Sequence, residues 1–518
     1  MRRRAELAIL VAIVTAAAMW WTWGALEPLP VVQDEYSYVL QSRIFASGHW
    51  TAPPAPVPSS FQQPHVLNTP RVASKFPPGH ALVMALGAMI GAPWLMPLAL
   101  SAISAALLFL LAESAAGPWI ALLCWALWLG DPINLRFRPG YYSELTSGAA
   151  WLASWWLLRR WYMTKRSRWL VYTALALGWM AITRPLTALA FAVPVGALVL
   201  THAARHRLWP QVLAALVAGT AIVAILPVWN VRTTGKWTES PAALYRRDYL
   251  PFDKPGFGLD TTPPALSLSP VNVDVYTEFA PEHQGYTLGR LPAAALARLR
   301  VLATAEWGGW RLALIPFVLI GLATASAELW FAIACAASLF AAYLSYGHSP
   351  RWTLYYFEAL PVAAFCAANG AATCLRWIRQ WKPAHTFARA ADWAPVALVG
   401  LLTLGSVATW RRAHIKDAAY DTWFKSAVAA APFRGVVVFV RYAPEQHPHS
   451  TVVTNSNTLA TDRVWVAIDD PARNVAVLRA AGGRVPLLFE EKGTTLSVYR
   501  SLVDSMTARD SVRPGSEH

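Results

Sequence analysis

LAILVAIVTAAAMWWTWGAL, residues 7–26, is a run of twenty residues without a charged side chain. A helix of about twenty apolar residues is long enough to cross a hydrocarbon core of about 30 Å. Arg2, Arg3 and Arg4 precede the run, and basic residues favour the cytoplasmic side of a membrane. The run is long for a signal peptide, and no convincing small-residue cleavage site follows it. We therefore expect a retained first span and a cytoplasmic N-terminus.

The composition of the whole chain indicates many spans. Of its 518 residues, 56% are apolar and 14% are charged, and the mean hydropathy is +0.35. Soluble proteins carry about 25% charged residues, so this composition excludes a soluble cytosolic enzyme, a disordered chain and a fibrous repeat. The net charge of +15 is explained by basic loops that face anionic lipid headgroups. We expect no nucleic-acid partner.

The remaining apolar runs predict about eleven spans in all. The run at 80–91 is too short to cross and begins with Pro77-Pro78-Gly79, so we expect a re-entrant or interfacial helix there. An odd number of spans places the basic loops 159–168, 202–207 and 376–389 in the cytoplasm, which agrees with their charge. Besides 7–26, the predicted spans are 93–112, 117–130, 144–160, 169–183, 186–201, 209–229, 310–325, 328–346, 353–374 and 393–410.

Three segments then lie on the outer side of the membrane: the loops 27–77 and 230–300, and the tail from Arg411. The tail carries 14 Lys/Arg and 11 Asp/Glu, so 25 of its 108 residues are charged, against 48 of the 410 before it. We therefore predict a mainly α, polytopic transmembrane bundle over residues 1–410 and a small soluble periplasmic α/β domain over 411–518. In the tail we expect a helix at 471–481 and strands at Val436–Tyr442, Thr451–Thr454, Val464–Ile468, Val485–Phe489 and Leu496–Tyr499.

Two adjacent acids, Asp34 and Glu35, follow the first span by about eight residues. Carboxylates at a lipid interface are costly unless they are solvated or used. The residues behind them recur at helical spacing up to Gly48, which predicts an amphipathic helix lying on the membrane. Two interpretations of Asp34 stay open on position alone: it is a functional acid, or it is the N-cap of that helix.

A second candidate motif is Ser74-Lys75-Phe76-Pro77-Pro78-Gly79, which leads into the short helix at 80–91. Lys75 lies where a phosphate would meet the positive end of that helix. The alternative, a lysine whose ammonium group reaches for lipid headgroups, is equally compatible with the motif.

The predicted outer ends of later spans also gather polar side chains, whereas the span centres hold almost no ionisable residue. An ion-coupled transporter needs ionisable or unwound sites near the midplane, so this asymmetry favours an interfacial enzyme. The side chains are Asp131, Arg136, Arg138, Tyr141, Tyr142 and Glu144 after the third span, Arg184 after the fifth, and His348, Arg351, Tyr355, Tyr356 and Glu358 after the ninth.

Together, the Asp-Glu pair with a following aromatic in a long first outer loop, the Lys-Phe-Pro-Pro-Gly motif and the C-terminal domain resemble the GT-C superfamily of glycosyltransferases, which use lipid-linked sugars. The chain is similar to the bacterial protein O-mannosyltransferases and aminoarabinose transferases of lipid A, which carry an Rgt-like domain. The resemblance covers about residues 7–370. It implies transfer of a sugar from a polyprenyl phosphate or diphosphate carrier to a glycan, lipid or protein acceptor on the outer face.

The resemblance also implies roles for individual residues. Asp34 matches the first-loop acid of the family and would be the general base of an inverting transfer, with Glu35 or Glu144 positioning the acceptor or tuning Asp34. Cations would hold the departing phosphate, and aromatic faces would contact acceptor or sugar. The phosphate-binding candidates are Lys75, Arg351, His348 and Arg138, and the contact candidates are Tyr36, Trp237, Tyr245 and Tyr249.

The sequence predicts no cofactor and no dedicated metal site. His447, His449, Asp469 and Asp470 are interpreted as solvated loop residues, and the four cysteines as packing residues, because no metal-binding spacing is present. We expect a multi-pass protein of a bacterial inner membrane whose partners are membrane lipids and a polyprenyl-phosphate sugar. The alternatives are a flippase of lipid-linked sugars, which would use the same groove without chemistry, and a non-catalytic assembly scaffold.

Overall fold

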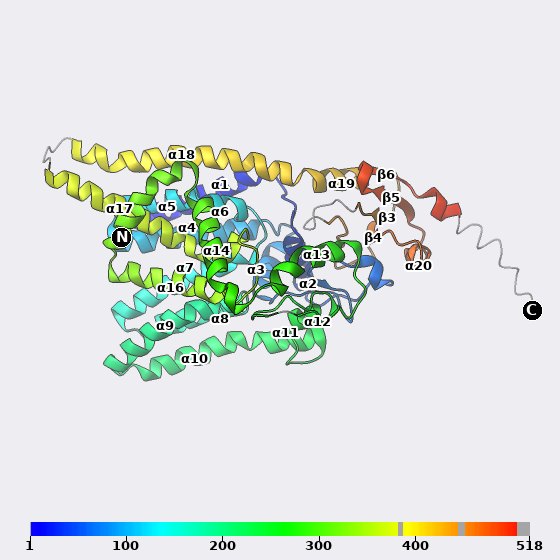
Figure 1. Ribbon diagram of the computed structural model, residues 1–518, viewed down its shortest axis with the longest axis horizontal. Coiled ribbons are helices and arrows are strands. Elements are labelled where there is room, and N and C mark those ends of the chain that lie inside the picture. Colours follow the sequence, from blue (N-terminus) through cyan, green and yellow to red (C-terminus); the bar gives the residue numbers. More distant parts are fainter. Residues whose placement is uncertain (1, 259, 382–386, 444–450, 505–518) are drawn as a thin grey trace, which may run out of the picture.

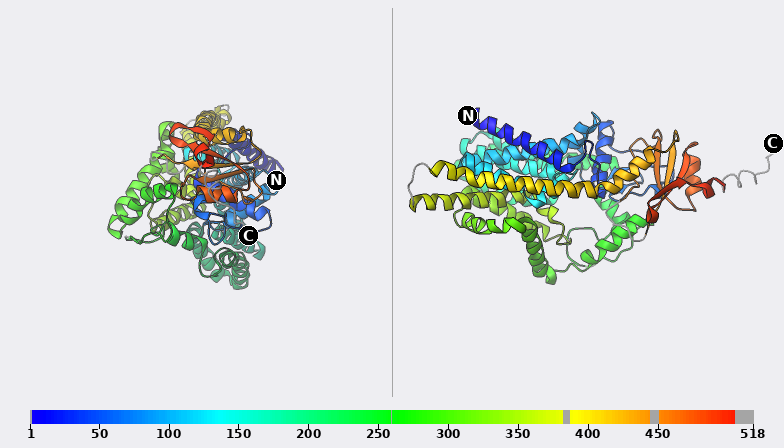
Figure 2. Two further views of the ribbon diagram at one scale, coloured as in Figure 1. Left: turned by 90° about the vertical axis from the view of Figure 1, so that its right-hand side faces the viewer. Right: turned by 90° about the horizontal axis from the view of Figure 1, so that it is seen from above.

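The computed structural model describes residues 2–258, 260–381, 387–443 and 451–504. Long helices run side by side to form an elongated bundle, and a small sheet lies beyond one end of it (Figure 1). The N-terminus lies toward the opposite end of the bundle, as the view from above also shows (Figure 2). The loops 27–77 and 230–300, with most of the short helices, gather at the end near the sheet.

All eleven predicted spans fall on helices. In the bundle α1 packs on α4 and α18, α7 on α4 and α8, α10 on α8, α16 on α9, and α15 on α17, with α5 against α4, α17 and α18. The helices are α1 (Arg2–Trp23), α4 (Leu95–Ala116), α5 (Pro118–Leu129), α7 (Ser143–Thr164), α8 (Ser167–Ala181), α9 (Pro185–His206), α10 (Trp209–Val223), α11 (Ile225–Thr234), α14 (Leu291–Trp307), α15 (Ile315–Ala323), α16 (Ala327–Tyr343), α17 (Leu360–Trp381) and α18 (Phe387–Asp417).

Fewer helices than expected are long and apolar enough to cross a membrane by themselves. Six helices within the described ranges qualify, or seven if the pair Leu288–Trp307 and Gly309–Ala323, which is bent by 101°, forms one span. The helices α5, α15 and α16 are shorter, with 12, 9 and 17 residues. The polytopic helical bundle is therefore present, and the count of eleven stays a prediction.

The end of the bundle near the sheet is built from short elements that connect the long helices. They are α2 (Gln33–Ala46), η1 (Pro58–Phe61), β1 (Val66–Leu67), β2 (Ala73–Ser74), α3 (Gly79–Ala88), α6 (Pro132–Phe137), α12 (Pro241–Asp248), α13 (Pro270–Gln284), η2 (Leu288–Arg290), η3 (Gly309–Leu314) and η4 (Thr353–Ala359). The predicted short helix at 80–91 corresponds to α3, which has 10 residues.

The helix behind the Asp-Glu pair differs from the expectation in two ways. It is not a surface helix, because ten of its fourteen residues are buried, and it packs against α3 and β2. The N-cap position belongs to Val32, and Asp34 is the second residue inside the helix. The interpretation of Asp34 as the N-cap is therefore wrong.

The C-terminal segment forms a four-stranded sheet of order β4-β3-β5-β6, in which β3 is parallel to β4 and β5, and β6 is antiparallel to β5. Four of the five predicted strands are present, whereas 451–454 has no regular structure, so that prediction is wrong. The elements are α19 (Ala419–Ala429), β3 (Val436–Arg441), β4 (Val464–Ile468), α20 (Asn474–Ala480), β5 (Val485–Glu490), η5 (Glu491–Gly493) and β6 (Thr495–Val498). His447 and His449 lie outside the described residues.

The sheet and α19 are anchored on the loop 27–77. The ring centroids of Phe61 and Trp465 lie 5.8 Å apart, and the Tyr36 hydroxyl donates a hydrogen bond of 2.9 Å to Asp421 at the start of α19. These contacts place the C-terminal elements over the end of the bundle that carries α2 (Figure 1). Whether residues 411–518 form an independent domain stays a prediction.

Candidate functional site

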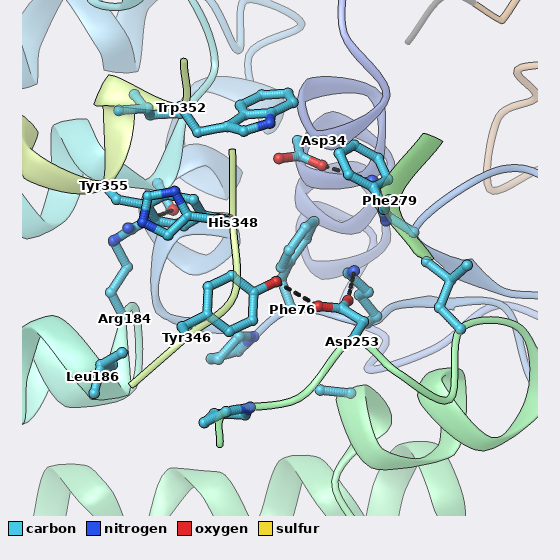
Figure 3. A pocket seen from close by; sticks show the side chains of 18 of the residues that line it. Asp34, Phe76, Arg184, Leu186, Asp253, Phe279, Tyr346, His348, Trp352 and Tyr355 are labelled. Atoms are coloured by element: carbon cyan, nitrogen blue, oxygen red, sulfur yellow. Dashed lines mark hydrogen bonds and ion pairs between the residues drawn. The ribbon is translucent and has the colours of Figure 1, made fainter. Parts of the chain in front are cut away.

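A cavity of about 350 Å³ opens at the end of the bundle where the loops 27–77 and 230–300 meet. Its walls come from the start of α2, the loop before α3, the starts of α7 and α9, the segment after α12, α13, and the stretch between α16 and η4. In Figure 3, Asp34 and Asp253 lie on one side of the cavity, and Arg184, His348 and Tyr355 lie on the other. Residues far apart in the sequence thus share one solvent-accessible space.

Asp34 reaches this cavity because Glu35 fixes the start of α2. One Glu35 oxygen accepts the backbone N–H groups of Val31 and Val32 at 2.9 and 3.0 Å, and the other accepts that of Tyr141 at 2.8 Å. Burial raises the pKa of Glu35 to about 7 against the lowering effect of these donors. Glu35 itself does not line this cavity. Its geometry is that of a residue which holds the backbone around Asp34.

The Asp34 side chain is 36% exposed, and its Oδ1 lies 2.9 Å from Nε2 of His65. Figure 3 shows the other carboxylate oxygen turned toward the interior of the cavity. His65 lies between α2 and β1 and also lines the cavity. No motif in the sequence indicated a role for His65.

Lys75 lies on the same side of the cavity, directly before α3. Its ammonium group is 3.0 Å from Asp253 Oδ2 and stands over the rings of Tyr245 and Phe76, at 5.0 and 5.2 Å from their centroids. The Tyr346 hydroxyl donates to the other oxygen of Asp253. Burial alone would raise the pKa of Asp253. The charge of Lys75 and the hydrogen bond from Tyr346 outweigh burial and hold this pKa well below its usual range. Lys75 is therefore a fixed cation with an ionised partner.

On the opposite wall, Arg184 stands between two carboxylates. It forms an ion pair with Glu144 and lies 3.5 Å from Glu358, and it donates a hydrogen bond of 2.7 Å to the Tyr343 hydroxyl. Ser147 donates to Glu358 as well. The Glu144 and Glu358 side chains are only 4% and 0% exposed. One guanidinium thus links α7, α9, α16 and η4 at the cavity wall.

His348 lines the cavity as expected, but its ring is not a cation. Burial lowers the pKa of His348 to about 3. Its Nδ1 lies 2.8 Å from the carbonyl oxygen of Ser349, which can only accept, so the neutral ring carries its proton on Nδ1. Any contact with a phosphate there would be a hydrogen bond without a full positive charge.

Buried Arg298 of α14 shapes this part of the wall. Its guanidinium donates to the backbone carbonyls of Tyr343, Tyr346 and His348, at 2.8, 2.9 and 3.2 Å. Hydrogen bonds to charged groups are stronger than neutral ones. Arg298 therefore fixes the stretch that carries three cavity residues.

Several residues that the sequence analysis proposed do not line the cavity. Arg351 is exposed, and Trp237 is 69% exposed. Arg138 is buried between the rings of Trp128 and Phe357, at 4.5 and 4.8 Å from their centroids. Tyr36 is held by Asp421, and Tyr245 and Tyr249 pack in a buried cluster beneath Lys75.

Other cavity residues received no role from the sequence. They are His65, Arg184, Asp253, Tyr346 and Arg246, the last from α12. Arg184 carried a usable signal, because Arg184-Pro185 lies at the predicted outer end of a span. Arg246 and Asp253 lie in the loop 230–300, whose aromatic and acidic residues suit a lid or an acceptor cradle. Within the described ranges, no group of three or more His, Cys, Asp or Glu side chains has the geometry of a metal site.

No protein-family model matches the chain, and no curated protein sequence matches it significantly. Its fold, however, is similar to that of a solved membrane glycosyltransferase. One similar solved structure is the crystal structure of ArnT, an aminoarabinose transferase, from Cupriavidus metallidurans bound to undecaprenyl phosphate. The two chains are 14% identical in sequence, and the match covers 97% of this chain and 95% of that one with a TM-score of 0.55. The apo state of the same protein gives 0.52 at 14% identity and the same coverage.

Proposed function

We propose that the protein transfers a sugar from a polyprenyl-phosphate-linked donor to an acceptor on the outer face of the membrane. The acceptor hydroxyl or amine attacks the anomeric carbon from the face opposite the phosphate. Its proton passes to Asp34, the bond from the anomeric carbon to the phosphate oxygen breaks, and the carrier leaves as polyprenyl phosphate. The configuration at the anomeric carbon inverts, because a single displacement needs one base and no covalent intermediate.

The observation that supports this proposal best is that Asp34 and Lys75 line one cavity in a GT-C fold. A lipid phosphate is a good leaving group and needs positive charge more than a separate acid. Lys75 has three N–H donors, so it can bind a phosphate oxygen while it remains hydrogen-bonded to Asp253. Arg246 adds a second positive charge to the same cavity. The solved ArnT structure with bound undecaprenyl phosphate supports a polyprenyl phosphate as the lipid.

The proposed topology makes one prediction. The C-terminal ends of α7, α9 and α17, which carry basic residues, lie at the end of the bundle away from the sheet (Figure 1), and positive charge next to a span favours the cytoplasm. In a bacterial inner membrane, a reporter that is active only in the periplasm should therefore be active when it is fused after Val503. Activity of a cytoplasm-only reporter at that position would contradict the topology.

The phosphate site makes a second prediction. Lys75→Met keeps the apolar stem and removes the charge, so we expect binding of undecaprenyl phosphate to weaken about 10- to 100-fold, the effect of one lost charge-assisted hydrogen bond. Binding is measured on the purified protein in nanodiscs by competition with a fluorescent polyprenyl phosphate.

The substitution also leaves the buried Asp253 carboxylate without its cation, so the double variant Lys75→Met/Asp253→Asn separates lost binding from lost folding. Lys254→Met is the matched control, because Lys254 is 51% exposed and pairs with Asp260 instead. Wild-type affinity in both Lys75 variants would place the phosphate elsewhere.

A further inference from the structure

The ring of His65 contacts Asp34, the proposed base. The backbone of His65 contacts Lys75, the residue proposed to bind the phosphate. Its Nε2 lies 2.9 Å from Asp34 Oδ1. Its carbonyl oxygen accepts the backbone N–H of Lys75 at 2.9 Å and the Ser37 hydroxyl at 3.0 Å. One residue therefore sets the position of Asp34 relative to Lys75.

The backbone of His65 adopts a conformation that side chains rarely take. Its φ is 63°, in the left-handed region that favours glycine and asparagine. The Tyr245 hydroxyl accepts the backbone N–H of His65 at 2.9 Å. The Lys75 N–H and the Ser37 hydroxyl donate to the His65 carbonyl, so both ends of the residue are held. A residue kept in a strained conformation by its surroundings is a candidate for a functional role of its side chain.

The surroundings also decide the protonation of the ring. The Asp34 oxygen accepts from Nε2, so the proton of the neutral ring lies there. Nδ1 is buried and has no hydrogen-bond partner among the described residues, so a proton on it would be unsatisfied. Burial and the positive charge of Lys75 lower the pKa of His65, and the carboxylates of Asp34 and Asp253 oppose this only in part.

We propose that His65 is a positioning residue for Asp34: its neutral ring donates Nε2–H to Oδ1 and keeps the other carboxylate oxygen directed at the acceptor. This inference rests on the proposed function, in which Asp34 is the base. A fixed donor also stabilises the ionised carboxylate, which is the form that accepts a proton. His65 transfers no proton itself, because Nδ1 is enclosed and Nε2–H is already committed to Asp34.

Two variants of similar length test the hydrogen bond. Gln supplies an N–H donor where Nε2 stood, and Met supplies none. We expect His65→Met to lower kcat about 10- to 100-fold, the equivalent of one hydrogen bond to a charged group, with the KM for the lipid donor unchanged. Its acid limb in the pH–rate profile should move to higher pH, because a carboxylate that loses a donor is easier to protonate. His65→Gln should recover most of the rate and the wild-type profile.

His49→Phe is the control, because His49 is an exposed histidine of the same outer loop. Sugar transfer is measured in proteoliposomes at several pH values, alongside the thermal stability of each variant. Equal losses in His65→Met and His65→Gln that follow their stability would mean that the ring only packs, and this would overturn the proposal. Wild-type rates in both variants would overturn it as well.

A measurement on the unmutated protein keeps the test independent of folding and of the reaction. In protein labelled with ¹⁵N-histidine, His65 should show a neutral ring protonated at Nε2 at about pH 7.5, above the ordinary pKa of histidine. Its signal is identified among the 12 histidines by its loss in His65→Gln. A charged ring or a proton on Nδ1 would refute the inference. Absence of transfer by the wild-type protein would instead refute the proposed function and leave this result standing.

Discussion

Replacing Asp34 with asparagine is expected to slow sugar transfer about 10²- to 10⁴-fold, the loss typical of a positioned acid–base group. Asparagine has nearly the same size as aspartate and can still accept the hydrogen bond from His65. It cannot take up the proton of the acceptor. The lipid donor should therefore bind as in the wild type, while the chemical step fails.

The structure makes this substitution a clean test of chemistry. Val32 is the N-cap of α2, so asparagine at position 34 replaces no cap. The charge that is lost lies in the first helical turn, where a carboxylate stabilises a helix by about 0.3–1 kcal/mol. Thermal stability should thus stay near that of the wild type. Asp34→Glu, which moves the carboxylate by one methylene, should recover little activity.

The measurement is transfer in proteoliposomes from a defined polyprenyl-phosphate sugar, with donor binding measured in parallel. Glu27→Gln is a matched control, because Glu27 is an exposed acid of the same loop, 27–77. A flippase would tolerate Asp34→Asn, since it performs no proton transfer. Transfer at the wild-type rate in the Asp34→Asn variant would end the proposed mechanism and favour that alternative.

The bundle could be predicted because apolar length is a local property of the sequence. Each predicted span coincides with a helix, and the Pro-Pro-Gly motif marked the start of α3 correctly. The prediction was wrong where tertiary contacts override the local pattern. The helix α2 has the spacing of a surface helix, yet α3 and the β1–β2 hairpin bury it. Residues 451–454 have the turn-bounded pattern of a short strand, but they form no regular structure.

The site was harder to predict than the fold, because its contacts cross large sequence distances. Lys75 and Asp253 are 178 residues apart, and neither position indicates the other. His65 follows a proline and precedes β1 in a loop without a recognisable motif. Its contact with Asp34 of α2 forms only when the chain is folded. Asp34 and Lys75 could be proposed because the family resemblance implied their roles, whereas their positions in the sequence left an alternative open for each.

Replacing Arg184 with methionine is expected to destabilise the protein by about 3–5 kcal/mol, the usual effect of breaking a buried ion pair from one side. Arg184 is the counter-ion of Glu144 and lies near Glu358, and both side chains are almost completely buried. Without the guanidinium, two carboxylates of like charge would remain in a poorly solvated wall. Such a site must bind protons or open to water.

The double variant Arg184→Met/Glu358→Gln decides whether charge is the cause. Glutamine keeps the acceptor for the Ser147 hydroxyl and removes one of the two negative charges. It should therefore restore part of the stability that Arg184→Met loses, whereas independent effects would simply add. Thermal unfolding of the detergent-purified variants measures this, with Arg232→Met, an exposed arginine at the end of α11, as the matched control. Two outcomes would contradict this: unfolding of Arg184→Met at the wild-type temperature, or no gain in stability when Glu358→Gln is added to it. Either would mean that charge does not hold Arg184, Glu144 and Glu358 together. The wall that faces Asp34 would then owe its shape to packing alone.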